Sequence, residues 1–215
     1  MNTRIENVLP AEIEHRSFEI ITQELAQMGK VLRPGTEPVV KRCIHTSADF
    51  DYADNLYFSE NAMEAGLNAI RSGATIVTDT QMARSGINKR TLERFGGEVL
   101  CFMSDEDVAA KAKELGCTRA AVSMDKAADL DKKLIFAIGN APTALIRLRE
   151  LIGENRIHPE LIIGVPVGFV NVTVSKELIM ETDVPCIVAR GRKGGSNIAA
   201  CICNALLYLL DNSRG

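Results

Sequence analysis

A loop rich in glycine and basic residues is the part of this sequence best suited to bind an anion. The loop runs from Arg190 to Ser196 with the sequence RGRKGGS, and it joins an apolar run to a predicted helix. Free backbone N–H groups and the positive end of a helix dipole suit a phosphate or a carboxylate. The chain contains neither GxxxxGK[ST] nor GxGxxG, so both kinds of anion stay open. The plain alternative is a flexible turn with solvated basic side chains.

A second segment, from Gly139 to Thr143, also joins an apolar run to a predicted helix. Pro142 suits the first turn of a helix, where its missing N–H costs nothing. The N–H groups from Asn140 to Thr143 are therefore candidates for anion binding, with a simple capping turn as the alternative.

Among the three histidines, His45 is the candidate for acid–base chemistry. It ends an apolar segment at 39–44, with Arg42 and Asp49 nearby, whereas His15 and His158 lie in charged surroundings. Histidine titrates near neutral pH, which suits a general acid or base. A lone histidine is more often structural. No Ser-His-Asp or Cys-His triad can be assigned, and no metal-ligand spacing is present, so we expect no metal site.

Composition excludes several classes of protein. The net charge of the 215 residues is -3, aromatic residues make up 5%, and tryptophan is absent. A nonspecific nucleic-acid binder needs a basic face and, for single strands, exposed rings. We therefore expect no nucleic-acid partner.

The six cysteines are predicted to be reduced packing residues. No CxxC pair occurs, and Cys201 and Cys203 would point about 200° apart on a helix.

Residues 1–17 lack the apolar core of a signal peptide, and the longest apolar stretch, 198–210, is too short to span a bilayer. We expect a cytoplasmic protein with no membrane segment.

Short apolar runs that alternate with helical patterns predict the fold. Strands are predicted at 74–77, 98–102, 134–138, 161–165 and 186–189, and helices at 12–28, 59–71, 88–95, 105–115, 119–130, 141–152, 174–181 and 196–210. Continuous apolar strands between helices indicate a parallel sheet covered on both faces. We expect an α/β fold in which residues 1–215 form a single three-layer domain, with a mainly parallel sheet flanked by helices. Ligands would bind beyond the carboxyl ends of the strands, where four polar or glycine-rich loops converge.

Five segments together resemble a known family. They are RSFEII at 16–21, RCIH at 42–45, IGNAPTAL at 138–145, GVPVGFV at 164–170 and RGRKGGS at 190–196. Their combination and order resemble the precorrin-8X methylmutase family, called cobalt-precorrin-8 methylmutase in the anaerobic branch of cobalamin biosynthesis. The resemblance extends over residues 14–207.

The resemblance implies an isomerase that moves a methyl group from C11 to C12 of a corrin macrocycle. The product would be hydrogenobyrinate or, with cobalt present, cobyrinate, and no separate cofactor would be needed. His45 would be the catalytic proton donor, and Ser17 and Arg42 would contact the substrate. The family also implies a homodimer with the ligand near the subunit interface.

The residues suit such a ligand, because carboxylates surround its flat apolar ring. Arginine forks and backbone N–H groups could bind the carboxylates, and Val165, Val167 and Phe169 could supply apolar surface. The full set of expected substrate contacts is Ser17, Arg42, Arg119, Asn140, Thr143, Arg190, Arg192, Gly194, Gly195 and Ser196.

One position departs from the family pattern, and two other functions stay open. Val174 stands where the family usually has an acidic residue, and Thr173 could cap the following helix instead. A non-catalytic corrinoid carrier would use the same basic loops. Without the resemblance, a nucleotide or sugar-phosphate enzyme that uses the loop at 190–196 would also fit.

Overall fold

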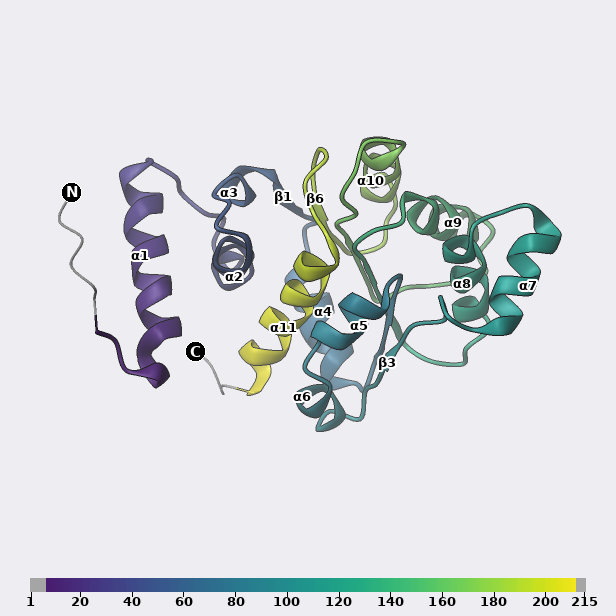
Figure 1. Ribbon diagram of the computed structural model, residues 1–215, viewed down its shortest axis with the longest axis horizontal. Helices are drawn as coiled ribbons and strands as arrows, with labels where there is room; N and C mark the ends of the chain where they lie inside the picture. The colour runs from purple at the N-terminus through teal and green to yellow at the C-terminus, as the bar shows by residue number, and fades with distance from the viewer. Residues whose placement is uncertain (1–6, 212–215) are drawn as a thin grey trace.

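A six-stranded sheet forms the middle layer of this computed structural model, which describes residues 7–211 (Figure 1). The strands are β1 (Leu56–Phe58), β2 (Thr75–Thr78), β3 (Val99–Leu100), β4 (Leu134–Ile138), β5 (Leu161–Gly164) and β6 (Cys186–Ala189). Their order is β1-β6-β5-β4-β2-β3, and every neighbouring pair is parallel except β1 with β6. The predicted α/β class with a mainly parallel sheet is confirmed.

The order of the strands reverses next to β2. From β2 the chain goes first to β3 on one side and then crosses to β4 on the other side. In open parallel sheets, such a switch point opens a crevice at the carboxyl ends of the two strands. The loops after β2 and β4 are therefore the natural place for a site.

Helices cover both faces of the sheet. Alternate residues of each central strand point to opposite faces: Ile135 and Ala137 of β4 pack on one side, and Phe136 and Ile138 on the other. The first face is covered by α2 (Glu37–Ser47), α4 (Ala62–Arg71), α5 (Gln81–Gly86), α6 (Lys89–Glu93) and α11 (Ser196–Asp211). The second face is covered by α8 (Arg119–Ala128), α9 (Pro142–Gly153) and α10 (Val172–Met180). The predicted three layers are therefore present.

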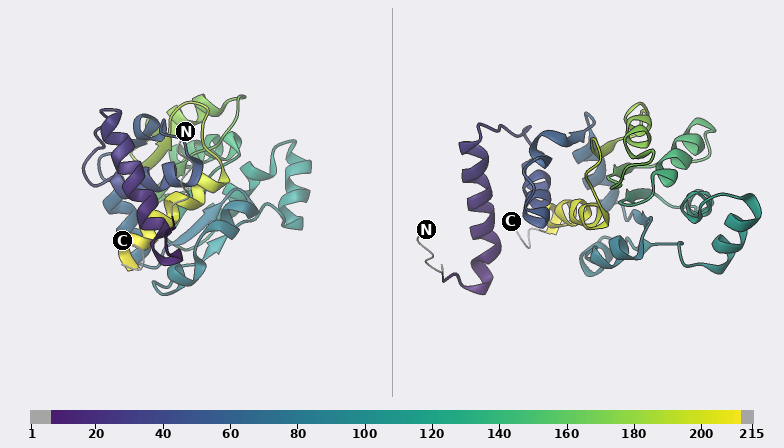
Figure 2. Two further views of the ribbon diagram at one scale, coloured as in Figure 1. Left: turned by 60° about the vertical axis from the view of Figure 1, so that its left-hand side comes forward. Right: turned by 45° about the horizontal axis from the view of Figure 1, so that its top comes forward.

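Two helices lie outside these layers. The first, α1 (Ile13–Gln27), follows a short 3-10 turn, η1 (Pro10–Glu12), and packs on α2 at one end of the molecule. The second, α7 (Glu106–Leu115), packs on α8 at the other end. Both helices stand at opposite ends of the molecule in Figure 1 and in the right-hand view of Figure 2.

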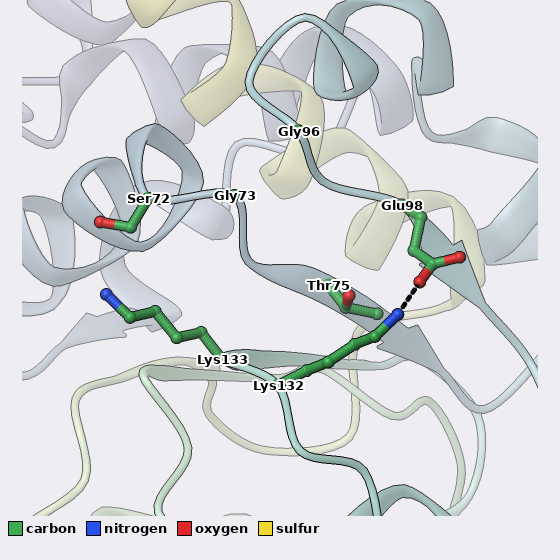
Figure 3. Close-up of a pocket in the computed structure, with 7 residues that line it drawn as sticks. All are labelled: Ser72, Gly73, Thr75, Gly96, Glu98, Lys132 and Lys133. Atoms are coloured by element: carbon green, nitrogen blue, oxygen red, sulfur yellow. Dashed lines mark hydrogen bonds and ion pairs between the residues drawn. The ribbon is translucent and has the colours of Figure 1, made fainter.

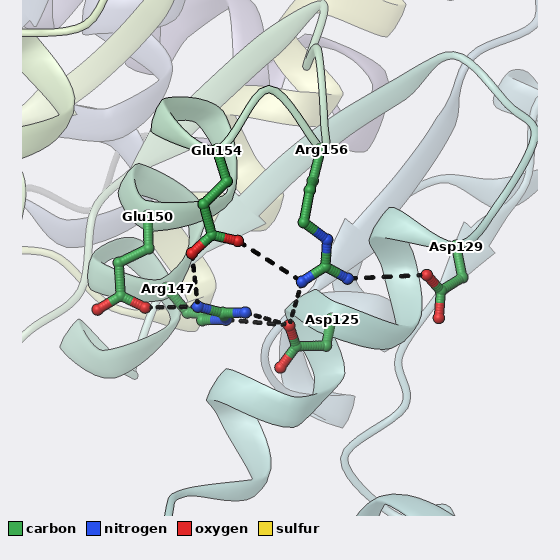
Figure 4. Close-up of polar contacts among 6 residues, drawn as sticks. All are labelled: Asp125, Asp129, Arg147, Glu150, Glu154 and Arg156. Atoms are coloured by element: carbon green, nitrogen blue, oxygen red, sulfur yellow. Dashed lines mark hydrogen bonds and ion pairs between the residues drawn. The ribbon is translucent and has the colours of Figure 1, made fainter.

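A network of charged side chains joins α8 to α9 on the outside (Figure 4). The guanidinium group of Arg147 donates to Asp125 Oδ1 at 2.8 and 3.0 Å and to Glu150 at 2.7 Å. Arg156 lies 3.7 Å from both Asp125 and Glu154. A network of this kind holds two helices more firmly than isolated surface pairs do.

The predicted strands are observed within a few residues, but other elements differ. The apolar segment at 39–45 lies within the helix α2, and the sequence analysis did not identify β1, α5 or the short helix α3 (Tyr52–Asn55).

The serine before α4, Ser59, accepts the backbone N–H of Cys186 at 2.9 Å and does not cap that helix. The expectation that Thr173 caps α10 was wrong. Thr173 lies inside α10, whose cap position is Asn171 with a φ of 57°.

Between residues 7 and 211, no helix combines the length and the apolar character that a membrane span requires.

All six cysteines are free thiols. The Sγ atoms of Cys43 and Cys201 lie 3.8 Å apart between α2 and α11, so they contribute to the packing of these two helices.

Candidate active site

The candidate site lies along the carboxyl edge of the sheet. Because β1 is antiparallel to β6, the chain before β1 reaches the same edge at which β6 ends. The N–H of Arg190 donates to the carbonyl of Asn55 at 2.8 Å. This pairing places the loop between α2 and β1 beside the glycine-rich loop at 190–195.

His45 lies in the last turn of α2 with its side chain exposed. Its ring centroid is 5.4 Å from that of Phe18 on α1, and the two planes are tilted by 34°. In the described part of the chain, no hydrogen-bond partner occupies the imidazole nitrogens, so both are open to a ligand.

Arg42 lies one helical turn before His45 and is largely enclosed. Its guanidinium group stacks on Phe18 at 5.2 Å and on Tyr208 at 4.8 Å, and it donates to Glu14 at 2.6 Å. Its side chain is 12% exposed. The structure thus gives Arg42 an internal carboxylate partner, which the sequence analysis did not anticipate.

Ser17 lies on α1, one residue before Phe18. Its hydroxyl donates to the carbonyl of Ile13 at 2.8 Å. The oxygen of this hydroxyl can still accept a bond, whereas its proton is already engaged.

An ion pair connects the glycine-rich loop to the end of α2. Lys193 Nζ lies 2.7 Å from Asp49 and 2.5 Å from Asp51. The hydrogen bond from Lys193 lowers the pKa of Asp49 below its ordinary value, in spite of some desolvation. This contact brings the His45 end of α2 and the basic loop together at one place.

Two arginines of this loop are exposed and stack on aromatic rings. Arg190 lies over Tyr57 at 4.9 Å, and Arg192 lies over Phe169 at 5.2 Å. Within residues 7–211 neither guanidinium group has a carboxylate partner. Both remain available for an anionic ligand, and their role in substrate binding stays a prediction.

The loop after β5 adds an apolar surface beside these arginines. The N–H of Gly168 donates to the carbonyl of Arg192 at 3.2 Å, so the two loops are in contact. Val167 and Phe169 are 48% and 81% exposed. Val165 is fully buried, so the expectation that it contacts the ligand was wrong.

The crevice at the switch point is filled by the protein itself. The buried carboxylate of Asp79, after β2, accepts the N–H groups of Gly139, Asn140 and Ala141 at 2.6 to 2.9 Å. The expectation that these amides bind substrate carboxylates was wrong for Asn140 and Ala141. The side chain of Asn140 is exposed at the same edge.

The start of α11 packs tightly against the loop after β4. A Cβ atom on Gly139 would lie 2.6 Å from Ser196 Cα, so only glycine fits there. The N–H of Gly195 donates to Val165 at 2.8 Å and is therefore not free for a ligand, contrary to expectation. The hydroxyl of Thr80 donates to Ser196 Oγ at 2.8 Å.

Thr143, at the start of α9, and Arg119, at the start of α8, lie beyond the carboxyl end of β4. The hydroxyl of Thr118, which caps α8, donates to Thr143 Oγ1 at 2.8 Å. Arg119 follows this cap and is exposed. The structure thus joins Arg119 to the Thr143 end of the site, and no contact between described residues links it to His45.

Two buried charged residues of the site, Asp79 and Lys176, were not identified from the sequence. Lys176 of α10 donates to the carbonyls of Gly191 and Lys193 at 2.8 and 2.9 Å. Asp79 stands between Thr78 and Thr80, and Lys176 stands between Ser175 and Glu177, so neither differs from a solvated residue by its local sequence. Burial lowers the pKa of Lys176 to about 8.

A small pocket opens at the opposite edge of the sheet, among residues that precede β2, β3 and β4 (Figure 3). It is lined by Ser72, Gly73, Thr75, Gly96, Glu98, Lys132 and Lys133. Glu98 and Lys132 form an ion pair there. Because it lies at the amino ends of the strands, the pocket is separate from the candidate site. The described residues contain no group of three or more His, Cys, Asp or Glu side chains that could hold a metal ion.

Comparison with known proteins gives consistent matches over nearly the whole chain. A family described as precorrin-8X methylmutase matches residues 12–209. The cobalt-precorrin-8 methylmutase of Priestia megaterium is 46% identical over 95% of this chain and 90% of its own. The enzyme of the same name from Salmonella typhimurium is also 46% identical, over 94% of this chain and 96% of its own.

A solved structure shows the same fold. The precorrin-8x methyl mutase of Thermus thermophilus superposes with a TM-score of 0.84 at 40% identity, and the match covers 95% of this chain and 100% of that one. The resemblance inferred from the five sequence segments is confirmed, and so is the methylmutase, an isomerase, as the enzyme class. The chain belongs to the precorrin-8X methylmutase family.

Proposed function

We propose that this enzyme moves a methyl group from C11 to C12 of precorrin-8 or cobalt-precorrin-8, with His45 as the proton donor. The observation that carries the role of His45 is its place. It is an exposed titratable side chain in the last turn of α2, beside Phe18 of α1, and the Lys193 ion pairs tie this end of α2 to the basic loop. An acid there can reach a ligand bound along the carboxyl edge.

The chemistry needs a proton and no redox partner. His45 donates a proton to a ring nitrogen, which draws electrons from the conjugated ring. The bond from C11 to the methyl carbon breaks as the bond to C12 forms, and the proton then returns to His45. All atoms and electrons stay within the substrate and the imidazole. A well-placed general acid contributes roughly 10²–10⁴-fold to such a step.

The surroundings of His45 suit a flat ring with many carboxylates. The exposed side chains of Val167 and Phe169 offer an apolar floor, and Arg190 and Arg192 offer guanidinium groups beside it. Each arginine already stacks on a ring, which holds its planar fork in place for a carboxylate.

The test is the conversion of both substrates by His45→Ala, followed by absorbance. We expect a fall in kcat of roughly 10²-fold or more, since the acid is lost, while hydrogenobyrinate still binds with near-normal affinity. His15→Ala is the matched control, because His15 is an exposed histidine on α1 that pairs with Glu19. Near-normal turnover by His45→Ala would remove His45 from the mechanism. Binding without conversion by the unaltered protein would favour a corrinoid carrier.

The enzyme is further proposed to work as a cytoplasmic homodimer. The free state of all six thiols supports a reducing compartment. An exposed apolar stripe along α1, formed by Ile13 and Ile20 of the helix and by Met28 just after its end, supports a second copy as the partner. The stripe lies next to the buried face of α1 that carries Ile21 and Leu25.

A further inference from the structure

Lys176 is a fully buried cation below the glycine-rich loop. It lies in α10, and its relative exposure is 0%. Within residues 7–211, no carboxylate pairs with its ammonium group, and its bonds go to two main-chain carbonyls, those of Gly191 and Lys193. A buried charge without a counter-ion is costly, so an apolar residue would serve simple packing better.

The two bonds determine which way the loop turns its peptide groups. In a planar trans peptide, the carbonyl of one residue and the N–H of the next point in opposite directions. With the carbonyls of Gly191 and Lys193 turned toward Lys176, the N–H groups of Arg192 and Gly194 point away from it. In the described chain these two N–H groups donate to no protein acceptor, whereas the neighbouring N–H of Gly195 is bonded to Val165.

We propose that Lys176 is a positioning residue for substrate binding, which holds the loop so that the N–H groups of Arg192 and Gly194 face a carboxylate of the corrin substrate. This inference rests on the proposed function. The two outward N–H groups belong to alternate residues of the loop and can donate to one anion, and the side chains of Arg190 and Arg192 are exposed in the same loop. The ammonium charge beneath the loop adds to the positive potential that the anion meets.

The positive charge of Lys176 contributes to anion binding in addition to its two hydrogen bonds. Every ionised side chain that the structure describes in this loop is basic, and the acidic groups next to it, Asp49 and Asp51, are already engaged by Lys193. A neutral donor could hold the two carbonyls, but it would leave the two outward N–H groups less attractive to a carboxylate. Burial lowers the pKa of Lys176 only to about 8, so the group still carries its charge at neutral pH.

The experiment compares Lys176→Met, Lys176→Arg and Ser175→Ala. Lys176→Met keeps the length of the side chain without the charge or the donors. Ser175→Ala is the control, because the buried hydroxyl of Ser175 bonds only within α10, to the carbonyl of Val172 at 2.9 Å. For each variant, KM and kcat of the methyl shift and the dissociation constant of hydrogenobyrinate are measured well below the melting temperature.

We expect Lys176→Met to raise KM and the dissociation constant ~10-fold or more while kcat changes little, because the loop is no longer held with the two N–H groups outward and the positive charge beneath it is lost. Lys176→Arg should recover part of the affinity, and Ser175→Ala should behave as the unaltered enzyme. A normal KM for Lys176→Met, or a loss confined to kcat, would overturn the inference.

A second measurement needs no variant. In amide NMR spectra of the unaltered enzyme, the signals of Arg192 and Gly194 should shift when hydrogenobyrinate is added, more than that of Gly195. Unshifted signals, in an enzyme that converts its substrate, would contradict this inference alone. An enzyme that binds hydrogenobyrinate but converts neither substrate would contradict the proposed function instead.

Discussion

Two buried charges of opposite sign shape the loops of the site from within. Asp79 accepts hydrogen bonds from three N–H groups of the loop after β4, and Lys176 donates to two carbonyls of the loop after β6. Each satisfies backbone groups that would otherwise cost free energy when buried. The exposed groups of the two loops are therefore those that a ligand can use.

At the scale of single residues, the sequence predicted the exposed basic groups better than the internal ones. Arg190 and Arg192 are exposed and free of carboxylates within residues 7–211. Arg42 has a partner, Glu14, that lies 28 residues away in sequence. Asp79 was not recognised because its role depends on a strand crossover that brings residues 60 positions apart together. Such pairings depend on the strand order, which local patterns do not contain.

The buried lysine predicts a dependence of stability on pH. Burial lowers the pKa of Lys176 from 10.5 to about 8, so between these values the unfolded chain binds a proton that the folded chain does not. The contribution of Lys176 to the free energy of unfolding should therefore rise as the pH increases through this range. We expect the free energy of unfolding of the unaltered protein, taken relative to that of Lys176→Met, to rise by about 2 kcal/mol from pH 7.5 to about pH 9.5 in urea denaturation.

The difference between the two proteins removes the other titrating groups, which they share. A difference that stays constant over this range would mean that the pKa of Lys176 is not lowered. The two carbonyl bonds, which favour the charged form, would then outweigh desolvation.

At the scale of elements, the β6–α11 loop depends on glycine at one position more than at another. Gly194 has a φ of 153°, and a Cβ there would lie 2.1 Å from the carbonyl oxygen of Val165. Gly191 has a φ of 74°, and a Cβ there would meet no atom within 4 Å. A side chain at Gly194 would meet both backbone strain and a steric clash, whereas a side chain at Gly191 would meet backbone strain alone.

We expect Gly194→Ala to lower the free energy of unfolding by ~3 kcal/mol or more, because both the strain and the clash must be relieved by moving the loop. Gly191→Ala should cost about 1–2 kcal/mol, the ordinary cost of a left-handed residue with a side chain. Urea denaturation of the two variants checks the order. Equal losses would show that the approach of Gly194 to Val165 is not a constraint in solution.

Elements with a strong local signal were predicted, and elements defined by pairing were not. The four longest strands and the helices α7 to α11 follow from apolar runs and helical spacing. The strand β1 has three residues and exists because it pairs with β6, so its sequence carries little signal of its own. Its antiparallel direction brings the end of α2, and with it His45, to the carboxyl edge.

At the scale of the molecule, the apolar surface is not fully covered by the three layers. Ile13 and Ile20 on α1 are 52% and 37% exposed, and Met28, which follows the helix, is 50% exposed. The helix α1 stands at the outer side of α2 (Figure 2, right). Because Phe18 of the same helix contacts His45 and Arg42, anything that covers α1 also lies close to the site. This is consistent with the proposal that the ligand binds near a subunit interface.

The proposed dimer can be tested by placing a charge in this stripe. We expect Ile20→Glu to convert dimers into monomers at micromolar concentration, because a carboxylate in an apolar interface must lose its hydration, while the circular dichroism of the chain stays unchanged.

Leu115→Glu is the control, since Leu115 on α7 is a 57% exposed leucine at the other end of the molecule. Sedimentation equilibrium gives the oligomeric state of each. A dimer that survives Ile20→Glu but is lost in Leu115→Glu would move the interface to α7, and a monomeric unaltered protein would contradict the dimer itself. If α1 forms the interface, Ile20→Glu should also weaken hydrogenobyrinate binding, because the Phe18 face of the same helix supports His45.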